Sequence, residues 1–221
     1  MSHFKHQMPV ELTAASWLPA TLLIFSVCFA WLLPPSYGQE NGPIENTQVV
    51  VLALAALVAV SALFQSHLTP PRRKLYALAG LGILLAIARE LSWGRVFYMD
   101  KAGNIPPLRA LWFGHYVFPV VTVLFVAALG YFFSQGLHKE LIYWLKHDRF
   151  PILDMLFIIG AIFIADVFEH HSYGLLGDKA EVFEELWELI SYTGILSFMI
   201  NIVFNKQFYG GKGLANSKIK S

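Results

Sequence analysis

The sequence predicts an all-α polytopic membrane protein, a bundle of six transmembrane helices. Hydrophobic residues make up 56% of the 221 residues, charged residues only 14%, and the mean hydropathy is +0.54. A soluble domain of this size needs less apolar side chain, and several apolar runs approach the roughly 20 residues that cross a bilayer. The single cysteine, Cys28, lies inside the first run, which excludes an intrachain disulfide and a CxxC motif. Basic residues are scattered over the loops, which argues against a nucleic-acid partner.

The chain divides into a polar N-terminal segment, a transmembrane domain and a basic tail. Residues 1–13 are expected to be cytoplasmic, 14–204 to form the membrane domain, and 205–221 to form a mobile cytoplasmic tail rich in Gly, Lys and Ser. A cleaved signal peptide is the competing interpretation of the first run, but the run is long and no small-x-small cleavage site follows it. The six spans are expected at about 14–34, 48–66, 75–94, 111–134, 151–170 and 182–204.

Basic residues predict the orientation of these spans. Placing both termini in the cytoplasm leaves eleven Lys and Arg residues in the inner segments and four in the outer loops. This bias is the positive-inside pattern of inner-membrane proteins. The outer four are Arg95, Lys101, Arg109 and Lys179, and Arg89 lies within a span.

The loop 136–149 alternates apolar and basic positions at helical spacing. Such a segment is expected to lie flat on the inner leaflet, and an ordinary solvated connector is the alternative. Tryptophans are expected near both membrane surfaces, with Trp17 at the inner surface and Trp93 at the outer one.

Ionisable residues gather at one depth in the predicted bundle. A helix rises about 1.5 Å per residue and the hydrocarbon core is about 30 Å thick. Arg89 and Glu90 on the third span, His115 on the fourth, Asp166 on the fifth and Glu188 on the sixth then lie roughly 5 to 10 Å below the outer boundary. Charge at this depth is costly, so the cluster is a candidate functional site.

Helical spacing places several of these side chains on common faces. Asp166, Glu169 and His170 are related by three and four residues and share one face, while Tyr192 lies one turn deeper than Glu188. Acids outnumber the nearby arginines, and in a low dielectric this surplus requires protonation or a bound cation.

Carboxylates beside imidazoles suit a divalent metal, so we expect zinc, manganese or iron in a hydrolase or transferase that acts on a lipid or lipid-linked substrate. Helix capping by Glu184 and Glu185, and an ion pair between Arg89 and Asp166, are the structural alternatives for these charges. The expected metal ligands are His115, Asp166, Glu169 and His170, the catalytic residues Glu90 and Glu188, and the substrate-binding residues Arg89, Arg95 and Tyr192.

Two other functions fit the same residues. A proton or metal-cation transporter needs polar groups across the membrane, yet the inner halves of the spans offer few beyond Asp154, although Pro119 permits a kink. A non-catalytic subunit could hold haem between His115 and His170, but so many acids make haem unlikely. The expected partners are membrane lipids, with protein partners or a homo-oligomer left open.

The end of the third span reads A-R-E-L-S-W-G-R-V-F-Y from Ala88 to Tyr98. This segment resembles a group of uncharacterised bacterial multipass membrane proteins that carry an acidic pair followed by x-S-W-G-Q-R at a helix end and a later Glu-rich helix like 184–192. Here Arg89 stands in place of the first acid and the glutamine is missing. The resemblance implies a bacterial inner membrane and supplies no function.

Overall fold

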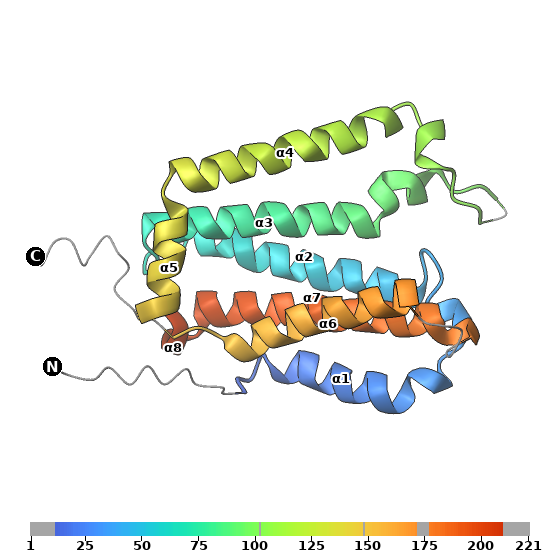
Figure 1. The fold of residues 1–221 in the computed structure, drawn as a ribbon, viewed down its shortest axis with the longest axis horizontal. Coiled ribbons are helices and arrows are strands. Elements are labelled where there is room, and N and C mark those ends of the chain that lie inside the picture. Colours follow the sequence, from blue (N-terminus) through green and yellow to red (C-terminus); the bar gives the residue numbers. More distant parts are fainter. Residues whose placement is uncertain (1–11, 102, 148, 172–176, 210–221) are drawn as a thin grey trace, which may run out of the picture.

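The structure, a computed structural model, describes residues 12–101, 103–147, 149–171 and 177–209. Every regular element in these ranges is helical, which confirms the all-α prediction. Six long helices form the body of the protein and lie alternately antiparallel (Figure 1). They are α1 (Trp17–Phe29), α2 (Pro43–Leu63), α3 (Pro70–Glu90), α4 (Gly114–Ser134), α6 (Ile152–His171) and α7 (Ala180–Phe204).

Short helices connect the long ones. The amphipathic α5 (Leu137–His147) lies across one end of the bundle, between α4 and α6 (Figure 1). A buried ion pair between Arg72 Nε and Glu140 Oε1, 3.1 Å apart, fastens α5 to α3, and the Arg72 guanidinium lies 5.3 Å from the Trp144 ring centre. The others are η1 (Ala30–Leu32), η2 (Pro35–Tyr37), η3 (Ser92–Tyr98), η4 (Leu108–Ala110), η5 (Gly177–Lys179) and α8 (Lys206–Tyr209).

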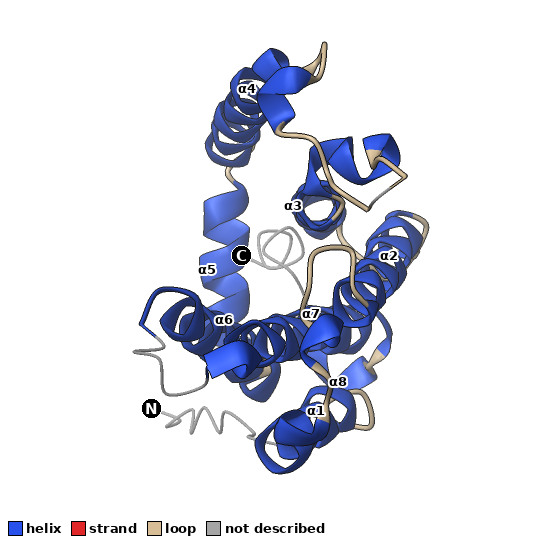
Figure 2. Cartoon of the chain, turned by 90° about the vertical axis from the view of Figure 1, so that its right-hand side faces the viewer, coloured by secondary structure: helices blue, strands red, loops and turns tan. Residues whose placement is uncertain are grey.

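Helix α7 is the centre of the bundle. It packs against α1, α2 and α6, and 15 of its 25 residues are buried. By contrast, α4 buries only Gly114 and stands apart from α6 and α7, and it contacts α3, α5 and η4 (Figure 2). The apolar faces of α4 are therefore available to lipid.

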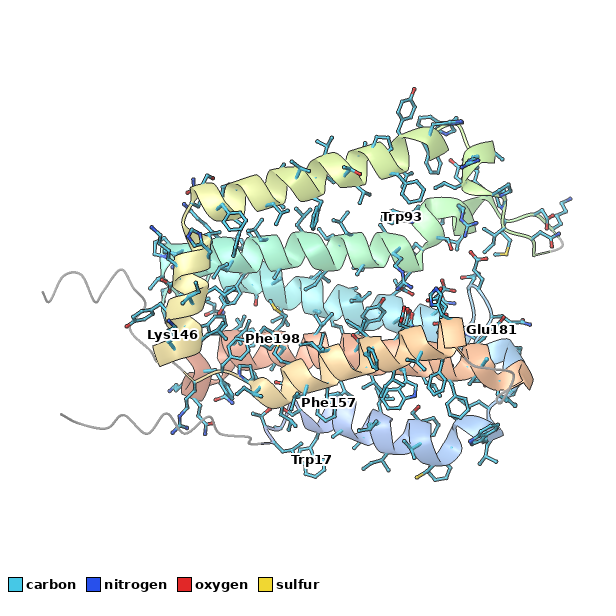
Figure 3. The ribbon with its side chains drawn as sticks, viewed as in Figure 1. Trp17, Trp93, Lys146, Phe157, Glu181 and Phe198 are labelled. Carbon is cyan, nitrogen blue, oxygen red and sulfur yellow. The ribbon has the colours of Figure 1, made fainter. Side chains whose placement is uncertain are left out.

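Three helices, α2, α4 and α7, are long and apolar enough to cross a membrane, and α3 with its bent continuation η3 makes a fourth. These helices mark the chain as a membrane protein. Helix α1 has only 13 residues, and α6 carries Asp154, Asp166 and Glu169. Six spans and cytoplasmic termini therefore stay predictions. Lys146 lies at one end of the bundle and Glu181 at the other, and Trp17 and Trp93 lie between them along its length (Figure 3).

Two helices begin earlier than their apolar runs. Helix α2 begins at Pro43 instead of 48, and α3 at Pro70 instead of 75, because proline at the first helical position favours the helical backbone before the apolar run starts. Helix α3 also ends earlier, at Glu90. There Ser92, Trp93 and Gly94 have φ angles of 47°, 56° and 87°, in the left-handed region, and the chain bends by 42°.

Candidate functional site

A pocket of about 270 Å³ lies between α3, α6 and α7, where α3 and α6 end and α7 begins. This is the end of the bundle at which the predicted depth places the ionisable cluster. The polar residues that line the pocket are Arg89, Asp166, Glu169, Glu188, Ser191 and Tyr192.

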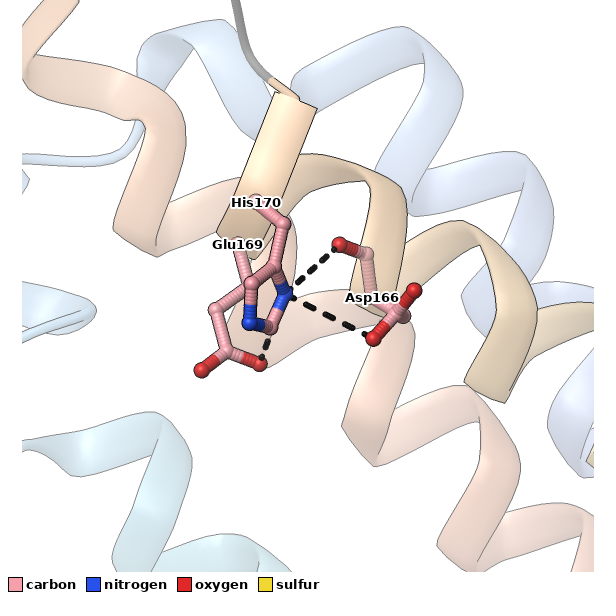
Figure 4. Close-up of side chains that lie close together, drawn as sticks. All are labelled: Asp166, Glu169 and His170. Atoms are coloured by element: carbon pink, nitrogen blue, oxygen red, sulfur yellow. Dashed lines mark hydrogen bonds and ion pairs between the residues drawn. The ribbon is translucent and has the colours of Figure 1, made fainter.

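The α6 wall of the pocket carries a group with the composition of a metal site. His170 Nδ1 lies 3.5 Å from Asp166 Oδ1 and 3.6 Å from Glu169 Oε2, and one ligand atom from each of the three lies within 4.8 Å of the others (Figure 4). All three side chains are exposed. The i, i+3, i+4 spacing places them on one helical face, and two carboxylates with one imidazole are ligands that zinc, manganese and iron accept.

The opposite wall holds Arg89 in a fixed position. Its Nη2 donates to Glu188 Oε1 at 2.8 Å, and its Nη1 donates to Tyr192 Oη at 3.0 Å and to Glu90 Oε1 at 3.1 Å. Tyr192 Oη in turn donates to Glu90 Oε1 at 2.7 Å. Arg89 thus pairs with Glu188 and Glu90, and not with Asp166 as the structural alternative expected. Because half of its side chain remains exposed, at 53%, the guanidinium is an oriented positive charge at the pocket wall.

A second group of acids includes Glu188 of this wall and extends away from the pocket. Glu90, Glu185 and Glu188 bring one ligand atom each within 4.8 Å of one another, and Glu90 is buried. Gln48 Nε2 donates to the Glu185 backbone carbonyl at 2.9 Å and to Glu185 Oε2 at 2.7 Å. Glu185 is therefore more than a helix cap. Sequence reasoning missed Gln48 because it began the second span at residue 48, whereas the Gly42-Pro43 pair signals an earlier start.

His115 and Arg95 belong to a different pocket. Arg95, Arg109 and His115 line a cavity of about 590 Å³ between η3, η4 and the start of α4. Arg95 Nη2 also donates to Glu40 Oε1 at 2.7 Å. His115 belongs to neither ligand group found among the described residues. The sequence predicts the depth of a residue along its helix, but it does not predict how far apart α4 and α6 lie. Because these two helices are separated, His115 is not part of the α6 group.

Deeper in the bundle, α6 and α7 share a second polar contact. Asp154 is fully buried and accepts hydrogen bonds from Ser197 Oγ at 2.8 Å and Asn201 Nδ2 at 2.6 Å. Between this contact and the pocket the helices approach closely, because a Cβ on Gly194 would lie 3.0 Å from Ile158 Cγ1. The two polar regions are therefore separated by packed side chains.

Comparison of the chain with protein-family models, curated proteins and solved structures found no match.

Proposed function

We propose that the chain is a metal-dependent hydrolase or transferase that acts on a lipid or lipid-linked substrate at the outer face of a bacterial inner membrane. In this proposal it has six spans and both termini in the cytoplasm. The observation that carries the proposal is one pocket in which Asp166 and Glu169, two members of the Asp–Glu–His group on α6, face an arginine and a glutamate held by α3 and α7.

Asp166, Glu169 and His170 are the proposed metal ligands. Three protein ligands leave a coordination position for water, and a bound metal makes that water a nucleophile near neutral pH. Glu188 lines the same pocket and is the proposed general base.

Glu90, the other expected catalytic residue, is better placed to act through its neighbours. It is buried and accepts hydrogen bonds from both Arg89 and Tyr192, so it orients these two side chains toward the pocket. Arg89 is the proposed partner of an anionic group on the substrate, because a guanidinium binds phosphate and carboxylate oxygens in a fixed geometry.

The basic pocket at the start of α4 supports an anionic substrate. Arg109 and His115 are exposed and line this pocket with Arg95. No carboxylate in the described part of the chain lies within 4.0 Å of the Arg109 or His115 nitrogens. A negatively charged head group would supply the missing partners.

The proposal is tested by elemental analysis and an absorption spectrum of the full chain purified in detergent. Stoichiometric zinc, manganese or iron is expected, and Asp166→Asn and His170→Ala should each lose it while remaining inserted in the membrane. Glu181→Gln, an exposed acid on α7, is the matched control and should keep the metal. Absence of bound metal after reconstitution contradicts the proposal, and a Soret band would favour haem instead.

Catalysis is tested separately with the metal-loaded protein in mixed micelles. Release of head group or acyl chain from an anionic phospholipid is expected, with less release from phosphatidylcholine. Glu188→Gln should lower the rate roughly 100-fold or more at unchanged zinc, manganese or iron content, because it removes the base. An unchanged rate would exclude Glu188 from this role.

Transport of protons or metal cations is the second candidate. The buried Asp154 with Ser197 and Asn201 favours it, since a second polar group then lies on the α6–α7 interface toward the other end of the bundle. The close packing at Gly194 counts against a continuous path. Cation or proton flux into proteoliposomes, abolished by Asp154→Asn, would support transport over hydrolysis.

A further inference from the structure

Glu90, Glu185 and Glu188 have unused oxygen atoms. Glu90 and Glu188 each engage Oε1, and Glu185 engages Oε2, in hydrogen bonds to neighbouring side chains. The second carboxylate oxygen of each makes no hydrogen bond within the described ranges. The three residues come from α3 and α7, and one oxygen from each lies within 4.8 Å of the others.

Two buried neutral side chains add oxygens without partners. Gln48 on α2 and Ser191 on α7 are both 0% exposed, and neither Gln48 Oε1 nor Ser191 Oγ finds a hydrogen-bond partner among the described residues. The Gln48 amide cannot be turned around without loss, because its Nε2 donates to two acceptors on Glu185. Ser191 lines the pocket beside Glu188. Buried polar atoms without a protein partner are commonly satisfied by an ordered water or a bound ion.

The balance of charges around these atoms favours a bound cation. Glu45, 8% exposed in the first turn of α2, also interacts electrostatically with Glu185 and Glu188. Together with Glu90, these carboxylates face one guanidinium, that of Arg89, in the described part of this region. Buried and half-buried carboxylates in such excess require either protonation or a compensating cation.

We infer that Glu90, Glu185 and Glu188, with Gln48 Oε1 and Ser191 Oγ, form a cation site separate from the group on α6. Its donors are all oxygen, whereas the α6 group includes an imidazole. Carboxylate, amide and hydroxyl oxygens suit a hard divalent cation, and the varied donors from three helices suit calcium better than the octahedral magnesium ion. Bound there, calcium fastens α2 and α3 to α7. This inference does not depend on the proposed enzymatic activity.

Calcium binding is tested by thermal unfolding of the full chain in detergent, after removal of metals with EDTA. Added calcium should raise the unfolding temperature more than potassium chloride does at matched ionic strength, because a ligand that binds only the folded state stabilises it. Terbium luminescence, sensitised by Tyr192, whose hydroxyl donates to Glu90, and lost when calcium displaces terbium, gives a second readout that does not involve unfolding.

Variants locate the site. Glu185→Gln and Ser191→Ala should each weaken calcium binding about tenfold or more, since the number and charge of the ligands set calcium affinity. Both substitutions are conservative, and without calcium neither should lower the unfolding temperature. Glu185→Gln removes charge repulsion between the acids, and Ser191→Ala removes a hydroxyl that has no hydrogen-bond partner among the described residues. Glu181→Gln, the matched control, should bind calcium normally.

Three outcomes would overturn the inference. The first is that calcium leaves the unfolding temperature and terbium luminescence of the unchanged chain unaltered, which would indicate protonated acids. The second is that calcium binding survives both Glu185→Gln and Ser191→Ala. The third is that His170→Ala abolishes it, which would indicate one shared site. The two sites are distinct if His170→Ala loses zinc but binds calcium, and Glu185→Gln loses calcium but binds zinc. If the unchanged chain binds calcium but no zinc, the proposed function fails and the calcium site is still supported.

Discussion

Single residues hold the pocket together through a directed chain of hydrogen bonds. Arg89 donates to the Tyr192 hydroxyl, and Tyr192 donates to Glu90, so the tyrosine links a cation at the pocket wall to a buried acid. Tyrosine suits this place because its hydroxyl accepts and donates at once. The rigid ring also fixes the distance between the hydroxyl and the α7 backbone.

Tyr192→Phe tests this chain. The change removes the hydrogen bond from Tyr192 to buried Glu90 and one acceptor of Arg89, so we expect the free energy of unfolding to fall by about 1–3 kcal/mol. Reversible unfolding in detergent with added denaturant measures the loss. Tyr131→Phe is the control, because Tyr131 is an exposed residue of α4, and it should change stability little. Equal effects of both substitutions would show that the Tyr192 hydroxyl contributes nothing specific.

Sequence reasoning grouped most of these residues as the structure places them, and it misplaced one. Helical rise alone put Arg89, Glu90 and Glu188 at one depth, and the structure brings all three into contact. His115 has the same predicted depth but lies in another pocket, since depth says nothing about which helices are neighbours. Gln48 escaped notice because an uncharged amide at the edge of an apolar run carries no signal until its helix is packed.

At the scale of elements, the α6–α7 contact depends on one small residue. Gly194 lets the two backbones approach, because any Cβ there would press on Ile158 and Phe157. Small residues at helix–helix contacts are common in membranes, where close packing replaces the hydrophobic effect as the source of association.

Gly194→Leu should therefore separate α6 from α7. Overpacking of this kind costs about 1–3 kcal/mol, so a lower unfolding temperature in detergent is expected. Gly160→Leu is a matched control on α6, because a side chain at Gly160 meets no atom within 4 Å. Should Gly160→Leu destabilise the protein as much as Gly194→Leu, crowding at the α6–α7 contact is not the cause.

The ends of the elements show which signals sequence reasoning underused. Apolar runs gave the centres of the helices, while prolines at 43 and 70 moved two starts by five residues each. The end of α3 is set by left-handed backbone at Ser92, Trp93 and Gly94. Gly94 predicts a turn, but nothing local predicts the left-handed backbone of Ser92 and Trp93. Ser92 Oγ donates to Glu40 Oε1 at 2.6 Å, and Glu40 is 52 residues away in the sequence. No local pattern encodes such a contact.

At the scale of the whole molecule, the number of crossings is the main open prediction. Reporter enzymes fused after Lys74 and after Asp178 should lie on opposite sides of the membrane, inside and outside respectively, because three predicted spans separate them. A reporter fused after Gly136 is the control and should lie inside. Lys74 and Asp178 reporters on the same side would show that α6 or another of these helices does not cross.

The packing at Gly194 has an electrical consequence. If the pocket end faces outward, as the bias of basic residues predicts, water and ions reach the acids from outside but meet close-packed side chains below Tyr192. Moving a unit charge fully across the membrane changes its energy by about 2.3 kcal/mol per 100 mV, but an ion that stops in the outer part crosses only a fraction of that field. Occupancy of the acids would then follow the ion concentration outside the cell and respond only weakly to the membrane voltage.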